Sequence, residues 1–217
     1  MKFHVVTLFP EVIDAYTQAS ILGRAQKNKI ISVKSVQLRD FAGNKWGKVD
    51  ERPFGGGPGM VLRAEPVVKA VGKIRSKIKN KKAKVKVLIT AAGGTPFTNA
   101  YAQKLVKNYS DVVIVCGRYE GIDERARKIL NAENISVGPY VLTGGEVPAL
   151  AIIDATARHI EGVLGKFESV EENRVSSHEI YTRPEVLEYK DKKYRVPKVL
   201  LSGHHAKMEE WKKGAKK

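Results

Sequence analysis

Short apolar runs rich in β-branched residues alternate with stretches of helix length through most of this 217-residue chain. The runs predict strands at residues 3–9, 30–38, 85–90, 112–116 and 135–137. The stretches between them predict helices at residues 10–18, 66–79, 98–108, 123–130 and 147–159, with Thr98 at the expected N-cap of the third. The last helix has one apolar face, formed by Leu150, Ile153, Ala157 and Ile160. Strands that alternate with helices form a parallel sheet covered on both faces, so the pattern predicts an α/β fold.

Two stretches do not fit this alternation. Residues 39–59 are rich in glycine and charge and include the run Phe54-Gly55-Gly56-Gly57-Pro58-Gly59, and residues 166–182 are polar and rich in glutamate. Such compositions are typical of loops and linkers. A final helical stretch is expected at about residues 205–213. We therefore expect an α/β domain at residues 1–165, a flexible loop at 166–182 and a small, basic, mainly helical module at 183–217.

The charge of the chain is strongly positive. Lys and Arg number 39 against 23 Asp and Glu, which leaves a net charge of +16. One cluster of cations lies at residues 69–86, within a stretch from 66 to 110 that has no acidic residue, and a second lies at 190–217. A lysine-rich surface can be merely solvated, but two such clusters favour a nucleic-acid partner.

Several classes of site and location are excluded or disfavoured. Cys116 is the one cysteine, so an intramolecular disulfide and cysteine-rich zinc sites are impossible. The adjacent His204 and His205 lack a third ligand at regular spacing, so we expect no metal site. No apolar run approaches the roughly 20 residues of a membrane span, and the N-terminus is more typical of a strand than of a signal peptide. We expect a cytoplasmic protein.

Three glycine-rich stretches follow predicted strands, at residues 91–96, 116–125 and 136–146. Each one alone is typical of a tight turn. Ligands of open α/β sheets bind at the carboxyl ends of the strands, and glycines allow backbone groups to approach a flat ligand closely. None of the three matches the dinucleotide or phosphate-loop motifs. Together they predict a pocket for an adenine-containing cofactor.

Six motifs occur in order along the chain: Gly55-Gly56-Gly57-Pro58-Gly59-Met60, residues 116–125, residues 140–146, residues 162–165, residues 181–185 and residues 200–206. Together they resemble the bacterial tRNA (guanine-N1-)-methyltransferase family, TrmD, of the SPOUT class, over residues 1 to about 213. The resemblance implies a parallel sheet with a deep trefoil knot that holds S-adenosylmethionine (SAM). It also implies a homodimer with active sites built from both chains, and methylation of guanine N1 at tRNA position 37. No DNA partner is expected.

The resemblance also implies a set of cofactor-binding residues. Backbone groups of Ile89, Gly138, Tyr140 and Leu142 would contact the adenine. Glu120 would approach the sulfonium, or would simply face the N-terminus of the following helix. Gly93 departs from the family, whose members usually have a longer polar side chain there. The full set is Ile89, Thr90, Ala91, Gly93, Gly117, Glu120, Ser136, Val137, Gly138, Tyr140, Leu142, Gly144, Gly145 and Pro148.

Methylation of guanine N1 needs a base for the N1 proton and a cation for the charge that develops on O6. Arg158 matches the family's arginine at O6. Asn173 occupies the position of the family's catalytic aspartate, and an amide cannot accept a proton as a carboxylate does. We expect Glu172, or with less support Glu171, to supply the carboxylate. The alternative is a non-catalytic SAM- and RNA-binding relative.

Further residues match family positions near the RNA: Asp50, Gly59, Ser169, Arg183, Ser202 and His205. Tyr181 and Trp211 are expected to pack against protein rather than against bases. A methyltransferase of the same class that acts on ribosomal RNA is a third hypothesis. The motifs at residues 181–185 and 200–206 argue against it, because they match the tRNA-specific family outside the cofactor domain.

Overall fold

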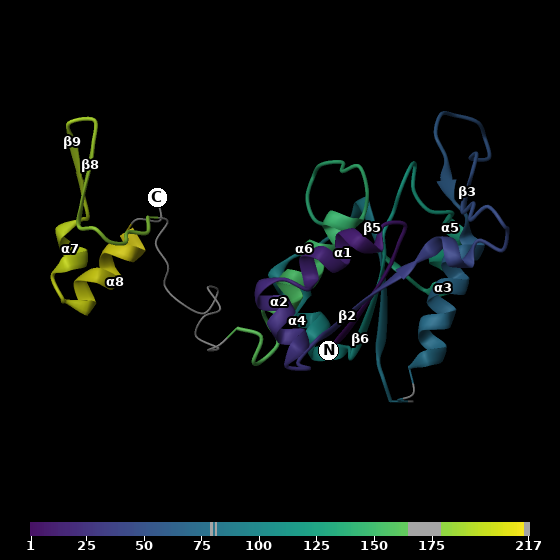
Figure 1. The fold of residues 1–217 in the computed structure, drawn as a ribbon, viewed down its shortest axis with the longest axis horizontal. Helices are drawn as coiled ribbons and strands as arrows, with labels where there is room; N and C mark the ends of the chain where they lie inside the picture. The colour runs from purple at the N-terminus through teal and green to yellow at the C-terminus, as the bar shows by residue number, and fades with distance from the viewer. Residues whose placement is uncertain (79, 81, 165–178, 215–217) are drawn as a thin grey trace. The chain divides into compact units, whose positions relative to one another are not determined.

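A computed structural model describes residues 1–78, 80, 82–164 and 179–214 of the chain (Figure 1). The chain divides into two compact units, Met1–Gly165 and Lys166–Lys217. No described helix has both the length and the apolar character that crossing a membrane requires.

The first unit is built on a five-stranded sheet in the order β2-β1-β6-β5-β7. Its strands are β1 (Lys2–Thr7), β2 (Ser32–Gln37), β5 (Val85–Pro96), β6 (Asp111–Val115) and β7 (Glu133–Ser136). Every pairing between them is parallel. All five predicted strands are therefore present, and the predicted α/β architecture with a parallel sheet is confirmed.

Helices cover both faces of this sheet (Figure 1). The helices α1 (Pro10–Thr17), α2 (Ser20–Lys27), α4 (Asn99–Asn108) and α6 (Glu146–Ala157) pack on one face. The helices α3 (Ala64–Lys77) and α5 (Glu124–Leu130) pack on the other with the 3-10 helix η1 (Leu38–Phe41). Along the fully buried β6, Val112 and Ile114 enter the first core while Val113 and Val115 enter the second. This alternation follows from the twofold period of a strand.

The five predicted helices are confirmed with small shifts at their ends. The Thr98 hydroxyl accepts a hydrogen bond from the Tyr101 backbone nitrogen at 3.2 Å, so it caps α4 as predicted. On α6, Ile153 and Ala157 are buried, whereas Leu150 is half-buried against the same core. Helix α2 was not predicted, although it buries Leu22 and Ala25.

Strand β5 extends well beyond its predicted end at residue 90. It pairs with β7 through Thr90↔Ile135 and again through Thr95↔Ile135, with an irregularity in register between the two. A Cβ at Gly94 would lie 2.5 Å from the Ile135 nitrogen, so the backbones approach too closely there for any side chain. The glycine-rich stretch at 91–96 is thus a bulged part of the strand rather than a loop after it.

The stretch at residues 39–59 contributes to a small ladder. Strand β3 (Asp50–Glu51) pairs antiparallel with β4 (Val61–Leu62). The residues between them include Gly55, Gly56 and Gly57, all with positive φ, and Phe54, whose side chain is 98% exposed.

The described part of the second unit contains an antiparallel hairpin of β8 (Val186–Tyr189) and β9 (Lys192–Arg195). The helices α7 (Lys198–Leu201) and α8 (His205–Gly214) follow it. The expectation of a mainly helical module overlooked the hairpin. Its loop places Lys190 and Asp191 at positive φ, a backbone conformation that aspartate tolerates but that a lysine does not indicate.

Candidate active site

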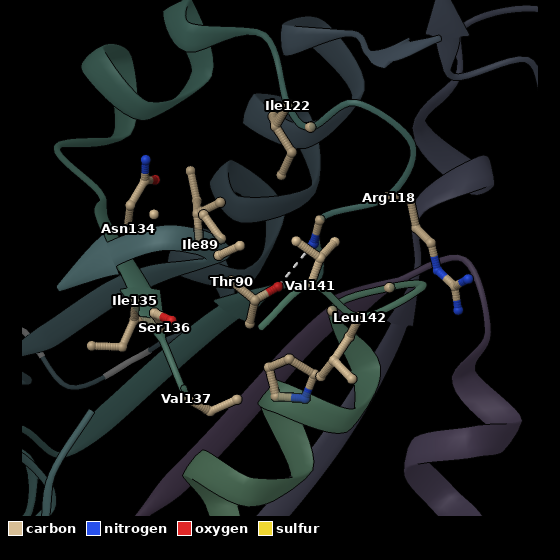
Figure 2. A pocket seen from close by; sticks show the side chains of 18 of the residues that line it. Ile89, Thr90, Arg118, Ile122, Asn134, Ile135, Ser136, Val137, Val141 and Leu142 are labelled. Atoms are coloured by element: carbon tan, nitrogen blue, oxygen red, sulfur yellow. Dashed lines mark hydrogen bonds between the residues drawn. The ribbon is translucent and has the colours of Figure 1, made fainter. Parts of the chain in front are cut away.

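A cavity of about 490 Å³ lies at the carboxyl ends of β5, β6 and β7 (Figure 2). This volume is within the roughly 300–1,000 Å³ of typical small-ligand pockets. Its lining includes every residue of the predicted cofactor set. Other residues of the three glycine-rich stretches line it as well: Ala92, Arg118, Tyr119, Gly121, Ile122, Glu124, Val141 and Thr143. Arg127, Asn134 and Ile135 line it from outside these stretches. The three glycine-rich stretches are therefore brought together around one space.

Close backbone contacts form the floor of this cavity. The Gly117 nitrogen donates to Thr90 Oγ1 at 3.0 Å, the hydrogen bond dashed in Figure 2. The Gly145 nitrogen donates to the Gly117 carbonyl at 2.8 Å. A Cβ at Gly145 would overlap the Thr90 hydroxyl and lie 2.6 Å from the Gly117 nitrogen. Glycine is required here by close approach between segments, because any side chain would push α6 away from β5 and β6.

The segment at residues 138–142 forms part of the wall. Ser136 Oγ donates to the Gly138 carbonyl at 2.9 Å, which fixes the turn at the end of β7. Tyr140, Val141 and Leu142 follow with exposed side chains. Ile89, Val137 and Leu142 provide apolar surface around the hollow in Figure 2. A flat ligand would therefore meet apolar side chains together with backbone polar groups.

Behind this segment lies a buried ion pair that was not predicted. Arg118 Nη2 is 2.7 Å from Glu146 Oε2, and the Glu146 side chain is only 3% exposed. The Thr7 hydroxyl donates to Glu146 Oε1 at 2.6 Å. Arg118 Nη1 donates to the Thr143 carbonyl at 3.2 Å, and its guanidinium lies 4.5 Å from the centre of the Phe9 ring. Arg118 thus connects the cavity wall with the ends of β1 and β6. In Figure 2 its guanidinium points away from Thr90.

Cys116 lies beside this pair at the end of β6. Burial, reinforced by the negative charge of Glu146, raises the pKa of the Cys116 thiol well above its usual value. A thiol with a raised pKa and no access to solvent is a poor nucleophile. Cys116 therefore acts as a core residue of the α/β unit.

Glu120 contacts the glycine-rich stretch around Gly59. The Glu120 nitrogen donates to the Met60 carbonyl at 3.0 Å, and a Cβ at Gly59 would lie 2.6 Å from Glu120 Oε1. Helix α5 begins at Glu124, and Asp123 caps it by accepting from the Arg125 nitrogen at 3.0 Å. Asp123 is therefore the N-cap of this helix, and Glu120 is among the residues that line the cavity. Its two compatible roles, toward a sulfonium and toward the helix N-terminus, stay predictions.

Asp50 adjoins the same region from β3. It pairs with Leu62 on β4, and the Leu62 nitrogen in turn donates to the Gly121 carbonyl at 2.9 Å. Asp50 and Gly59, predicted to lie near the target nucleotide, are thus connected by backbone hydrogen bonds to a stretch that lines the cavity.

Arg158 is not brought to this cavity. Helix α6 begins beside the cavity at Glu146, and Arg158 is its C-cap after 12 helical residues. At 1.5 Å per residue, Arg158 lies about 18 Å along the helix from the cavity end. The predicted catalytic residues Glu172 and Asn173, the alternative Glu171 and the predicted RNA contact Ser169 lie outside the described residues.

The remaining predicted RNA contacts lie in the second unit. Arg183, Ser202 and His205 are exposed there. Ser202 Oγ donates to the Val199 carbonyl at 2.7 Å at the end of α7. The rings of Tyr181 and Trp211 are 6.2 Å apart and contact each other. Within the part of the chain that the structure describes, no group of three acidic, histidine or cysteine side chains is arranged to hold a metal.

Five exposed apolar side chains, which we call the apolar strip, belong to the N-cap and body of α1, to α2 and to the start of α6. Its side chains are between 36% and 58% exposed and belong to Phe9, Val12, Tyr16, Ile21 and Val147. Tyr16 also donates its hydroxyl hydrogen to Asp154 Oδ2 at 2.6 Å, which joins α1 to α6. Exposed apolar surface of this kind is typical of a protein interface.

Comparison with known proteins agrees with these features. A family model described as tRNA (Guanine-1)-methyltransferase TrmD matches residues 1–217. The tRNA (guanine-N(1)-)-methyltransferase of Desulforamulus reducens is 43% identical over 98% of this chain and 83% of its own length. The proteins of the same name from Ruminiclostridium cellulolyticum and Clostridioides difficile are 44% and 42% identical over 98% of this chain, and over 89% and 91% of their own lengths. The chain therefore belongs to the tRNA (guanine-1)-methyltransferase family TrmD.

Proposed function

We propose that this protein transfers a methyl group from SAM to N1 of the guanosine at position 37 of tRNA. The observation that carries the proposal is the cavity at the ends of β5, β6 and β7, which gathers the cofactor residues expected from the family into one site. The sequence similarity along the whole chain supports the same activity.

The residues at this cavity fit SAM. Its glycine-dense walls combine backbone groups suited to an adenine with the apolar side chains of Ile89, Val137 and Leu142. The carboxylate of Glu120 can complement a positive sulfonium. When bound, SAM supplies a methyl group activated by this sulfonium. The knot expected of SPOUT proteins would use the segments at residues 117–123 and 138–145, which already contact each other through Gly117 and Gly145.

The chemistry at guanine requires groups that remove the N1 proton and stabilise charge on O6. We assign the first role to a carboxylate of the segment at residues 165–178, with Glu172 as the first candidate and Glu171 as the second. Asn173 stands at the position of the family aspartate. Arg158 is assigned to O6, where a guanidinium can donate two hydrogen bonds to developing negative charge.

A homodimer explains how Arg158 can act. One chain holds it about 18 Å along α6 from its own cofactor cavity, so a second copy is needed to bring an arginine to each site. The apolar strip of Phe9, Val12, Tyr16, Ile21 and Val147 supplies a surface that a second copy would cover. The active site would then contain residues of both chains.

The RNA partner is consistent with the charge of the protein, +16 overall. We assign tRNA contacts to the module at residues 183–217, through Arg183, Ser202 and His205, and to Asp50, Gly59 and Ser169 near the target nucleotide. Phosphate neutralisation by the lysines of this module would supply affinity without sequence specificity. We expect the protein to act on tRNA in the cytoplasm.

The test is transfer of labelled methyl from SAM to an unmodified tRNA with guanosine at position 37, with adenosine at that position as the control. Label in the guanosine tRNA alone supports both activity and target. The variants Glu172→Gln and Asn173→Asp then locate the base. A large loss of turnover in Glu172→Gln would assign removal of the guanine N1 proton to Glu172. Unchanged turnover in this variant would exclude Glu172 as the base. Binding of SAM without transfer to either tRNA would favour the non-catalytic alternative.

A further inference from the structure

A second cavity, of about 660 Å³, lies at the opposite edge of the five-stranded sheet, where the strands begin. Its lining includes Lys2 at the start of β1, Lys77 at the end of α3, and Ser110 and Asp111 just before and at the start of β6. The central strand β6 has 5 residues, so this edge is about 17 Å from the edge that carries the cofactor cavity. In Figure 1, α3 ends and β5 begins at this edge.

The backbone at this edge is rigidly connected. The Lys2 nitrogen donates to the Ser110 carbonyl at 2.9 Å, and the Ser110 nitrogen donates to the Lys84 carbonyl at 3.0 Å. The starts of β1, β6 and β5 are thereby joined side by side. Lys2 and Lys84 stand on either side of Ser110, about 10 Å apart across two strand spacings. Both residues are exposed, so the backbone at this edge presents two lysine side chains to solvent.

Lys77 lines the cavity as Lys2 does, and Lys82, Lys84 and Lys107 each adjoin a lining residue in the sequence, Ala83 or Val106. None of these lysines has a carboxylate partner within the described ranges. Lys77, Lys82 and Lys107 are exposed, and none of them forms an ion pair with a described residue. We call Lys2, Lys77, Lys82, Lys84 and Lys107 the lysine rim. The sequence from residue 66 to residue 110 offers them no local acidic partner, since it contains no Asp or Glu.

Asp111 is the one carboxylate among the residues that line the cavity. Its Oδ1 lies 3.1 Å from His4 Nε2, and its Oδ2 accepts a hydrogen bond from the Ser110 hydroxyl at 2.8 Å. The Asp111 side chain is only 4% exposed. Its two oxygens are therefore engaged inside the protein, and the exposed charge around the cavity is positive.

We propose that the lysine rim binds the phosphate backbone of tRNA at a part of the molecule outside the anticodon arm. The inference rests on the proposed function, which places the anticodon loop of a tRNA at the sheet edge that carries the cofactor cavity. Because the rest of a tRNA extends far beyond one nucleotide, other parts of it can reach the opposite edge. Lysines without a carboxylate partner among the described residues suit phosphates, which need point charges rather than base recognition. The rim then positions the substrate and contributes affinity that does not depend on base sequence.

The test compares two RNAs, a full unmodified tRNA and a hairpin that reproduces only its anticodon arm with guanosine at position 37. Binding of each is measured without SAM over a range of salt concentrations, for the wild type and for Lys77→Gln/Lys84→Gln. We expect the double variant to bind full tRNA about tenfold more weakly than the wild type at moderate salt. The slope of log affinity against log salt concentration should fall by the equivalent of about one to two phosphate contacts. Binding of the hairpin should change less than about twofold, because it offers the rim no distant phosphates.

The matched control is Lys34→Gln/Lys128→Gln, which removes the same charge from exposed positions on β2 and α5, outside the lysine rim. The assignment of the rim would be overturned if the control variant lost as much affinity for full tRNA as the rim variant. It would also be overturned if the rim variant lost as much affinity for the hairpin as for full tRNA, or lost no affinity for full tRNA. Methylation of both RNAs by the wild type separates this result from the proposed function. If the wild type methylates neither RNA, the proposed function fails, while the binding comparison still tests the rim.

Discussion

Removing the Glu146 carboxylate should destabilise the protein more than most single substitutions. Its side chain is 3% exposed, forms an ion pair with the Arg118 guanidinium at 2.7 Å and accepts a hydrogen bond from the Thr7 hydroxyl at 2.6 Å. Breaking a buried pair by deleting one partner typically costs 3–5 kcal/mol, because the other charge stays buried without compensation. The Arg118 side chain retains 23% exposure, which places the expected loss for Glu146→Ala at the lower end, about 3 kcal/mol.

The assay is urea unfolding, with the free energy of unfolding obtained by linear extrapolation. The matched variant Arg118→Met/Glu146→Gln removes both charges and keeps a buried side chain of similar size at each position. It should cost less than about 1.5 kcal/mol, because replacing a whole buried pair is often close to neutral. The reasoning is refuted if Glu146→Ala costs less than about 1 kcal/mol, or if the double variant is as unstable as the single one.

Three further outcomes are expected. Gly145→Ala should lower stability by about 1–3 kcal/mol and weaken SAM binding in calorimetry, since the added Cβ would overlap the Thr90 hydroxyl. Unchanged SAM affinity would contradict the close packing of Gly145 against Thr90. Cys116 should react with a thiol reagent only as fast as the folded protein opens, because burial raises the pKa of its thiol; rapid labelling of folded protein would disprove this. Burial raises the pKa of Glu133, but hydrogen bonding to Lys86 outweighs burial, so the pKa of Glu133 is lowered overall. The pair therefore stabilises the protein above the unfolded pKa of about 4.3, and this stabilisation is lost as the pH falls through the folded pKa. Lys86→Met should therefore cost up to about 1 kcal/mol at pH 7 and progressively less as the pH falls below the unfolded pKa of Glu133, and a pH-independent difference would point to packing alone.

The elements that depend on local pattern were predictable. The five parallel strands are short apolar runs, and β6 is buried on both faces, as a central strand of an α/β sheet must be. Thr98 caps α4 through a contact only three residues away. The glycine-rich stretches after the strands indicated the edge of the sheet at which a ligand would bind, because parallel strands end at the same edge.

Other features required the folded chain. Helix α2 follows α1 after a short break, and its apolar residues Leu22 and Ala25 are too few to stand out from a loop. The extension of β5 to Pro96 depends on pairing with β7, almost 40 residues later. Neither can be recognised from local propensity, because the stabilising contacts come from other elements.

Family resemblance supplied the residues of the cofactor cavity, but not the interactions behind it. Arg118, Glu146 and Thr7 form a network across residues up to 139 positions apart. No periodicity or motif connects them, since burial together with charge complementarity is a property of the assembled core. The position of Arg158 at the far end of α6 likewise became evident only when the length and start of that helix were known.

The amino-acid order alone was sufficient for the strand and helix pattern, the family and the positive charge, because these depend on composition, local periodicity and short motifs. The folded chain added the shape of the cavity, the buried ion pair, the distance of Arg158 from this cavity, and the lysines at the opposite edge of the sheet. Each of these depends on side chains that are distant in sequence meeting in space. Their energies and distances therefore arise from packing rather than from any local signal.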